Sequence, residues 1–252
     1  MATTHKVLLI EDDEDLRQCL RELLSEHYLV FTANDGVEGV AVAKQHHPTV
    51  ILLDLMMPRS DGFETLKFLR EDPETRATPV LILTALSDLN VRLRTFNLGA
   101  DDFMSKPMNT EELLARIASK IRLLESLTPK KRTDALIQCG NLSMNPRSLE
   151  VRIGDDVVPL SLLEFNLVRY FVKHKDKLRT RRQILEAVWS NREISERILD
   201  PHILLIRRKL KGFDHQIATV YGGGYILKSP RHLVEGAGAT GSDVGSVAPE
   251  LE

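Results

Sequence analysis

The stretch "VILLDLMMP" (residues 50–58) has four apolar residues in a row, followed at once by the carboxylate of Asp54. A short apolar run of this kind favours a strand that is buried on both faces, as in the middle of a parallel sheet. Asp54 then stands at the carboxyl end of that strand, where functional residues of open α/β sheets gather. The stretch therefore predicts a buried central strand with an acid at the edge of its sheet.

Similar apolar runs recur through the first half of the chain and alternate with segments that carry apolar residues at helical spacing. The expected strands are residues 6–10, 29–33, 50–54, 79–83 and 101–105. The expected helices are residues 13–26, 36–46, 61–70, 88–98 and 110–125. Five such repeats predict an α/β fold in which a five-stranded, doubly wound parallel sheet has helices on both faces.

The composition is that of a soluble globular protein, with 42% apolar and 28% charged residues in 252. This length suits two domains. Residues 1–124 hold 14 Lys and Arg against 20 Asp and Glu, whereas residues 133–232 hold 17 against 11. An acidic half followed by a basic half indicates different partners for each, and the basic half permits a polyanion.

Nothing in the sequence points to a membrane or to secretion. The apolar runs are too short to span a bilayer, and the first residues lack the apolar region of a signal peptide. The spacing of Cys19 and Cys139 matches no metal or redox motif, so a reducing compartment is expected. We therefore expect a cytoplasmic protein.

Acidic residues follow two of the expected strands. Glu11, Asp12 and Asp13 come after the first strand, and Asp54 ends the third. In a parallel sheet these ends are neighbours, so the carboxylates repel one another and need a cation, for which Mg²⁺ is the best fit.

Two further strand ends supply a hydroxyl and an ammonium group. Thr84 and Lys106 follow the fourth and fifth strands. A carboxylate such as Asp54 can accept a phosphoryl group when a metal ion and a cation neutralise the developing charge. Each residue alone fits a polar cap on a strand, but all of them at one edge favour a phosphoryl-accepting site.

These motifs together resemble the receiver domain of two-component response regulators. The resemblance covers about residues 5–125 and rests on Glu-Asp-Asp at 11–13, "DLMMPRSDG" at 54–62, "LTA" at 83–85 and "GADDFMSKP" at 99–107. It implies the flavodoxin-like fold of the chemotaxis protein CheY. It also implies that Asp54 is the phospho-acceptor and that Lys106, before a cis peptide to Pro107, binds the phosphoryl group.

The resemblance assigns further roles. Glu11, Asp12, Asp54 and the backbone carbonyl of Met56 would bind Mg²⁺, and Thr84 and Phe103 would be the switch pair. Asp13 is expected to cap a helix. Phosphorylated receivers of this kind pair through a charged face, which here would comprise Arg92, Asp101, Asp102, Glu112 and Arg116.

The second half reads differently. A polar linker at residues 126–135 precedes short strand-like segments, helical segments near 161–174, 181–189 and 196–211, and a hairpin that turns at Gly222–Gly224. Residues 231–252 have the composition of a disordered acidic tail. We expect an α+β domain over residues 136–230.

This half resembles the winged helix-turn-helix domain of OmpR/PhoB-type regulators, in "PLSLLEFNLVRYFVKH", "TRRQILEAVW", "RILDPHILLIRRKL" and "TVYGGGYIL". The resemblance implies a transcription regulator, not an enzyme. A sensor histidine kinase would phosphorylate it, and the phosphorylated homodimer would bind double-stranded DNA. The DNA contacts are expected among Arg179, Arg181, Arg182, Arg197, His202, Leu204, Leu205, Arg207, Arg208 and Tyr221.

The third helical segment carries an unusual outer face. Leu199, Ile203, Ile206 and Leu210 form one apolar stripe for the core. The opposite face presents Arg197, Pro201, Leu204, Leu205 and Arg208. Pro201 either starts the helix after an Asp200 cap or kinks a helix that begins near Arg197.

Relatives usually have polar or basic residues at the positions of Leu204 and Leu205, and often arginine at the position of Tyr221. Leucine cannot hydrogen-bond a base edge. The main interpretation is a DNA-binding regulator with few direct base contacts. The alternatives are a response regulator whose apolar patch (Leu204, Leu205 and Tyr221) binds protein, and a phosphohydrolase that uses the acidic residues.

Overall fold

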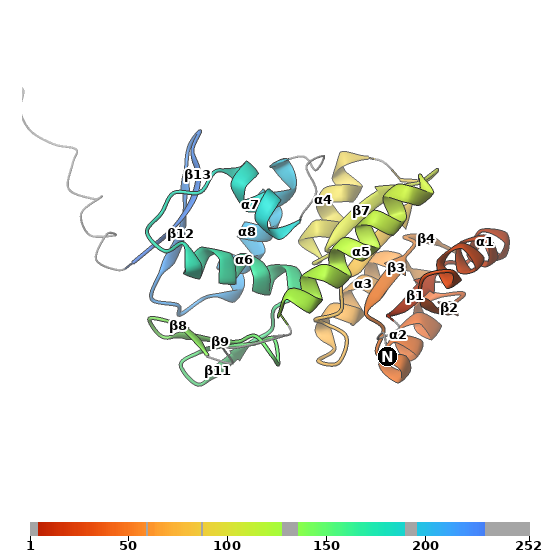
Figure 1. Ribbon diagram of the computed structural model, residues 1–252, viewed down its shortest axis with the longest axis horizontal. Helices are drawn as coiled ribbons and strands as arrows, with labels where there is room; N and C mark the ends of the chain where they lie inside the picture. The colour runs from red at the N-terminus through yellow and green to blue at the C-terminus, as the bar shows by residue number, and fades with distance from the viewer. Residues whose placement is uncertain (1–4, 59, 87, 128–135, 190–195, 230–252) are drawn as a thin grey trace, which may run out of the picture.

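The computed structural model describes residues 5–58, 60–86, 88–127, 136–189 and 196–229 (Figure 1). Of Arg197, only the backbone belongs to the described part. None of the helices in these ranges is long and apolar enough to cross a membrane. The predicted tail at 231–252 lies outside the described residues, as does most of the predicted linker.

The first half folds around a five-stranded parallel sheet with the order β2-β1-β3-β6-β7. Its strands are β1 (Lys6–Ile10), β2 (Leu29–Ala33), β3 (Val50–Leu53), β6 (Val80–Thr84) and β7 (Asp102–Ser105). β3 lies in the middle and is fully buried, because helices cover both faces of the sheet. The predicted doubly wound α/β fold is confirmed.

The helices of this half are α1 (Glu14–Ser25), α2 (Gly36–His46), α3 (Gly62–Glu71), α4 (Leu89–Asn97) and α5 (Thr110–Leu127). Alternate residues of β1 enter opposite cores: Val7 packs in the cluster that includes Leu20 of α1 and Ile117 of α5. Leu8 packs in the cluster that includes Leu66 of α3 and Phe96 of α4. The period-two alternation of strand side chains thus creates the two helical layers.

A short hairpin, β4 (Met56–Met57) with β5 (Ser60–Asp61), links β3 to α3. Asp61 caps α3 by accepting a hydrogen bond from the amide of Phe63 at 2.8 Å. Gly62 follows, and a Cβ there would lie 2.5 Å from the carbonyl oxygen of Asp54 and from Cα of Leu55. The helix therefore starts in direct backbone contact with the end of the central strand.

The second half begins with an antiparallel sheet of order β11-β10-β9-β8. Its strands are β8 (Ile137–Cys139), β9 (Leu142–Asn145), β10 (Glu150–Ile153) and β11 (Asp156–Val158). The helices α6 (Leu162–Lys173), α7 (Arg181–Val188) and α8 (Leu199–Lys209) follow, and a 3-10 turn at Glu196–Ile198 leads into α8. The hairpin β12 (Gln216–Val220) and β13 (Gly224–Lys228) completes a winged helix-turn-helix domain.

The ends of these helices follow local sequence signals. Asp13 caps α1, as predicted, by accepting from the amide of Leu16 at 3.0 Å. Ser161 and Thr180 each form a capping box at the start of α6 and α7. Pro201 is the third residue of α8, inside the first turn, where a missing N–H breaks no helical hydrogen bond. The helix thus begins at Leu199, after the 3-10 turn that contains Arg197, and without a cap by Asp200.

The two halves are packed together through α4 and α8, which lie side by side in Figure 1. His202 of α8 lies between Phe96 of α4 and Trp189 at the end of α7, with ring centroids 5.4 and 5.6 Å away. The hydroxyl of Ser119 in α5 donates to the carbonyl of Trp189 at 3.1 Å. One cluster of buried apolar residues consequently runs from the first domain into the second.

Candidate functional site

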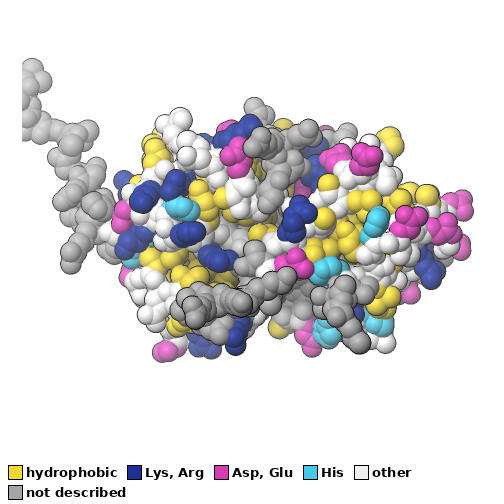
Figure 2. All heavy atoms as spheres, viewed as in Figure 1, with side chains coloured by type: hydrophobic (Ala, Val, Ile, Leu, Met, Phe, Trp, Pro, Cys, Tyr) yellow, Lys and Arg dark blue, Asp and Glu magenta, His cyan; other side chains and the backbone are white. Residues whose placement is uncertain are grey.

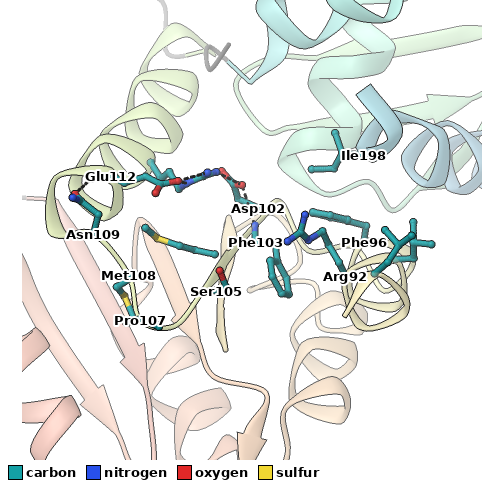
Figure 3. Close-up of a pocket in the computed structure, with 14 residues that line it drawn as sticks. Arg92, Phe96, Asp102, Phe103, Ser105, Pro107, Met108, Asn109, Glu112 and Ile198 are labelled. Carbon is teal, nitrogen blue, oxygen red and sulfur yellow. Dashed lines mark hydrogen bonds and ion pairs between the residues drawn. The ribbon is translucent and has the colours of Figure 1, made fainter. Parts of the chain in front are cut away.

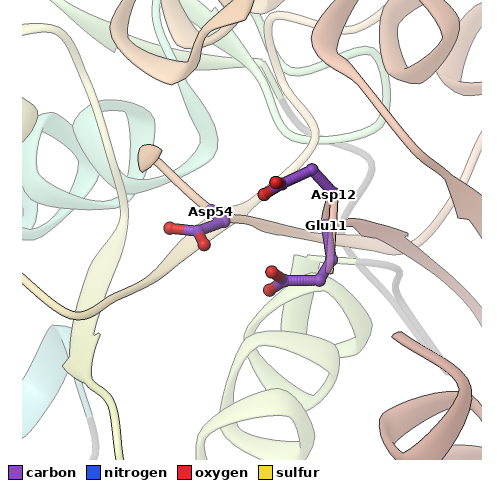
Figure 4. A group of neighbouring side chains, drawn as sticks. All are labelled: Glu11, Asp12 and Asp54. Atoms are coloured by element: carbon purple, nitrogen blue, oxygen red, sulfur yellow. The ribbon is translucent and has the colours of Figure 1, made fainter. Parts of the chain in front are cut away.

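An acidic pocket, formed by Glu11, Asp12 and Asp54, lies at the carboxyl edge of the parallel sheet (Figure 4). Glu11 and Asp12 directly follow β1, and Asp54 directly follows the adjacent β3. One oxygen from each carboxylate lies within 4.8 Å of the others. The parallel register of these two strands brings the predicted acids together.

Lys106 provides the cation of this pocket. Its ammonium group lies 2.6 Å from Glu11 Oε2 and 2.6 Å from Asp54 Oδ2. Burial raises the pKa of Glu11 to about 7, although the hydrogen bond and charge of Lys106 oppose the shift. Burial alone would lower the pKa of Lys106, but its bonds to Asp54 and Glu11 raise it. A salt-bridged lysine therefore holds the two carboxylates together.

The backbone around the pocket is held by further contacts. The amide of Met56 donates to Asp54 Oδ1 at 3.1 Å, which brings the backbone at Met56 to the acidic pocket. The peptide between Lys106 and Pro107 is cis, as the resemblance implied. Arg17 of α1, which the sequence motifs did not indicate, donates to the carbonyl of Glu11 at 2.8 Å and to that of Asp12 at 3.1 Å. Only its i+5 and i+6 spacing from the acids could have suggested it.

The switch candidates occupy the neighbouring strands. Thr84 is fully buried at the end of β6, and its hydroxyl accepts from the amide of Leu86 at 3.3 Å. Phe103 lies in β7 beside β6, and the guanidinium of Arg92 in α4 lies over its ring, 4.9 Å from the centroid. The ring of Phe103 is therefore held on the α4 side of the sheet.

The donor set suits a hard divalent cation. Three carboxylates can supply oxygen ligands, which Mg²⁺ prefers, and the backbone at Met56 is close enough to bond Asp54. In the same space, the carboxylate of Asp54 has an ammonium group beside one oxygen and an amide beside the other. Such an arrangement neutralises negative charge around a carboxylate nucleophile.

Comparisons with known proteins place this chain. A family model described as "Response regulator receiver domain" matches residues 7–118, and one described as "Transcriptional regulatory protein, C terminal" matches residues 155–227. The response regulator ArlR of Staphylococcus aureus is 33% identical over 227 residues, which cover 88% of this chain and 99% of ArlR. The chain is a response regulator of the OmpR/PhoB type. The family predicted from the sequence motifs is confirmed.

Two solved structures of mutants of RitR resemble the whole chain. The cysteine-to-serine mutant is 27% identical with a TM-score of 0.74, and the cysteine-to-aspartate mutant is 28% identical with a TM-score of 0.71. Each match covers 89% of this chain and 99% of the RitR chain. The likeness thus extends over the receiver and the DNA-binding domain of this response regulator.

Most of the residues expected to form a dimer face already form ion pairs within the receiver domain. Asp101 is only 2% exposed and binds Arg70 of α3 at 2.6 Å, so its prediction as a surface residue is wrong. Asp102 is buried as well, between Arg116 at 2.7 Å and Lys120 at 3.1 Å. The sequence could not reveal this because the cations come from helices α3 and α5, which are distant in sequence from these two acids. Of the predicted set, Glu112 is exposed and Arg92 and Arg116 are half-buried.

His202, at the start of α8, is also buried. Predicted as a DNA contact, it lies in this structure with its ring enclosed by Phe96 and Trp189, and neither nitrogen has a hydrogen-bond partner among the described residues. Pro201, expected on the outer face, is buried too. The first turns of α8 face the receiver domain, which the periodicity of a single helix cannot indicate. Trp189 was also missed, although it is the only tryptophan of the chain.

In the rest of α8, the buried and exposed side chains agree better with the sequence-based prediction. Leu199, Ile203, Ile206 and Leu210 are buried, as predicted for the apolar stripe. Leu204 is 45% exposed, Arg208 is exposed and Leu205 is half-buried. Lys and Arg side chains gather over the DNA-binding domain in Figure 2, whereas acidic side chains gather at the far end of the receiver.

Several predicted DNA contacts are engaged inside the domain. Arg207 donates to the carbonyl of Ile217 and to the hydroxyl of Thr219, both at 2.8 Å. Arg181 binds Asp200 at 3.1 Å and the hydroxyl of Tyr225 at 3.3 Å. These bonds tie the helices to the β12–β13 hairpin, so the two arginines have structural partners before any DNA arrives.

The other candidates lie at the surface around the helices. Arg182 is exposed and pairs with Glu186 at 3.1 Å, and Arg179 is half-buried where its backbone pairs with Tyr225. Tyr221, at the tip of the hairpin, is 98% exposed. The side chain of Arg197 lies outside the described residues.

Proposed function

We propose that this response regulator controls transcription by phosphorylation of Asp54. The observation that carries the proposal is the acidic pocket with Lys106 bonded to both Glu11 and Asp54. In the transfer step, an oxygen of Asp54 forms a bond to phosphorus while the bond between phosphorus and the histidine of a sensor kinase breaks. The product is an acyl phosphate on Asp54.

Two side chains of this chain and a bound metal ion would stabilise the transfer. Lys106 lies within bonding distance of Asp54 and can move its bonds from Asp54 to the new phosphoryl oxygens. The hydroxyl of Thr84 accepts a single 3.3 Å hydrogen bond from the described residues and can turn toward the same group. Bound Mg²⁺, held by Glu11, Asp12, Asp54 and the carbonyl of Met56, would supply further charge neutralisation.

The domain contact suggests how phosphorylation reaches DNA. The first turns of α8 pack on α4, so the helix that would enter a major groove is partly covered by the receiver. We infer that rearrangement of Thr84 and Phe103 weakens this contact, frees the receiver face for pairing, and exposes α8. Two DNA-binding domains would then bind a repeated site on double-stranded DNA.

The domain limits belong to this proposal. We assign residues 1–125 to the receiver, 126–135 to the linker, and 136–230 to the DNA-binding domain. The helix α5 continues to Leu127, two residues into that linker.

The test separates phosphorylation from DNA binding. The purified protein is treated with acetyl phosphate and Mg²⁺, and phosphorylation is followed by Phos-tag electrophoresis, with Asp54→Asn as the control. Genomic DNA fragments are then selected with each form. We expect phosphorylation of the wild type alone, and stronger enrichment of specific fragments by the phosphorylated protein. Equal enrichment by Asp54→Asn and by the phosphorylated wild type would contradict the proposal.

A second candidate function follows from Leu204 and Tyr221, which expose apolar surface where relatives usually carry polar or basic groups. In that case the apolar patch binds a protein and sequence-specific DNA binding is weak. The same selection discriminates, because this candidate predicts no fragment enrichment even at low salt.

A further inference from the structure

An interdomain cavity of about 400 Å³ lies between α4, β7 and the start of α5 (Figure 3). Its walls combine apolar and polar side chains, and one apolar residue of the lining, Ile198, comes from the DNA-binding domain. The apolar lining comprises Leu89, Leu93, Phe96, Phe103, Met104, Pro107, Met108 and Ile198. A volume of this size and lining suits a small organic ligand.

The acidic and basic side chains at one side of the cavity form ion pairs with one another. Arg116 binds both Asp102 and Glu112, and Lys120 also binds Asp102 at 3.1 Å. Two carboxylates are thereby matched by two cations. These groups hold each other in place and leave no charge of their own for a ligand.

Arg92 is the cation left over in the lining. Its guanidinium lies over the ring of Phe103, and its buried Nε has no hydrogen-bond partner within the described parts of the chain. A buried donor without a partner is costly, so a ligand oxygen that reaches it gains a charge-assisted hydrogen bond. The lining thus combines apolar side chains with one guanidinium group, that of Arg92, which forms no ion pair with the described residues.

We propose that this interdomain cavity binds a small apolar monocarboxylate. The carboxylate accepts from Arg92, and the aliphatic or aromatic body fills the space between Leu93, Met108 and Ile198. Because Ile198 belongs to the other domain, part of the contact surface is lost when the domains separate. The bound acid therefore favours the closed arrangement of the two domains, which is the one described above with α8 packed on α4.

The position of the cavity also connects it to phosphorylation, and this step rests on the proposed function. The ring of Phe103, the switch candidate, lines the cavity. If phosphorylation of Asp54 opens the domains, ligand binding and phosphorylation oppose each other. Bound ligand then disfavours phosphorylation by the same factor by which phosphorylation weakens ligand binding. A cellular carboxylate would then act as a second input that keeps the regulator off DNA.

The first experiment measures binding alone, on the unphosphorylated full-length protein. Isothermal titration calorimetry is run with decanoate and with 2-naphthoate, and the neutral 2-naphthamide is the control ligand. We expect at least one acid to bind with a Kd below about 1 mM and the amide to bind about tenfold more weakly or worse. Absence of binding by both acids at that concentration overturns the proposal.

Two variants test the assignment. Arg92→Met keeps the apolar stem but removes the cation, and it should lose the preference for acid over amide. Arg94→Met is the matched control on the same helix, because that guanidinium lies over Phe63 and does not line the cavity. Equal loss in both variants, or in neither, contradicts the role of Arg92.

The coupling is tested separately. The acid that binds is titrated into protein phosphorylated with acetyl phosphate, and its affinity should fall several-fold. Unchanged affinity overturns the opposition between ligand and phosphoryl group. Since binding to the unphosphorylated protein needs no phosphorylation, failure of the proposed function is recognised independently, by the absence of a phosphorylated band.

Discussion

Gly62 is the point where the backbone itself shapes the acidic pocket. The motif "DLMMPRSDG" ends on this residue, and its lack of a side chain lets α3 begin against the carbonyl of Asp54. The same contact fixes the direction in which the strand end leaves the sheet. The side chain of Asp54 is therefore positioned by a steric requirement eight residues away as well as by Lys106 and the amide of Met56.

Replacing Gly62 by alanine should destabilise the receiver and slow phosphorylation of Asp54. The new Cβ would meet two backbone atoms at 2.5 Å, which cannot rotate away. Overpacking of this kind costs about 1–3 kcal/mol, measured as the free energy of unfolding in urea. Gly154→Ala is the control, because nothing lies within 4 Å of its Cβ and only its φ of +59° opposes alanine. Because the positive φ of Gly154 has its own cost for alanine, the rate of phosphorylation decides: equal rates in the two variants would remove the steric explanation.

At the scale of elements, α8 separates what the sequence could predict from what it could not. The stripe of Leu199, Ile203, Ile206 and Leu210 follows from helical periodicity and is buried as expected. The burial of His202 does not follow from it, because its neighbours are Phe96 of α4 and Trp189 at the end of α7. The spacing of apolar residues within one helix predicts one buried face. The start of α8 is also buried against another domain, which this spacing cannot indicate.

The same contrast holds at the acidic pocket. Its acids and Lys106 could be predicted because parallel strands of known order bring their ends together. The partners of Asp101 and Asp102 could not, because Arg70, Arg116 and Lys120 are placed by helix packing and not by strand order.

The exposed Leu204 leads to a prediction about DNA affinity. Leu204→Arg should strengthen binding to DNA of any sequence, because an added cation on the exposed face of α8 releases about one more counterion. The slope of log affinity against log salt should become steeper by about 1, as measured by fluorescence anisotropy. Val157→Arg, on the exposed strand β11, is the control for added charge elsewhere. An unchanged slope would indicate that this face of α8 does not approach DNA.

At the scale of the whole molecule, the closed arrangement buries an imidazole that has no hydrogen-bond partner in the described part of the chain. Burial, together with nearby cations, lowers the pKa of His202 from an ordinary 6.5 to about 3. The charged groups around it are Lys120, Arg70 and Lys209, with Asp102 acting in the opposite direction. The domain contact is thus built for a neutral histidine.

Acid should therefore open the molecule. The separated form binds a proton on His202 below pH 6.5, whereas the closed form does not bind one until about pH 3. Stability of the closed form is fully present above 6.5 and falls by about 1.4 kcal/mol per pH unit below it. Small-angle X-ray scattering should show a larger radius of gyration at pH 5.5 than at pH 7.5. His202→Phe, which cannot titrate and can still pack between Phe96 and Trp189, should remain compact at both pH values. If the variant expands as the wild type does, other groups open the domains and the neutral histidine is not what holds them closed.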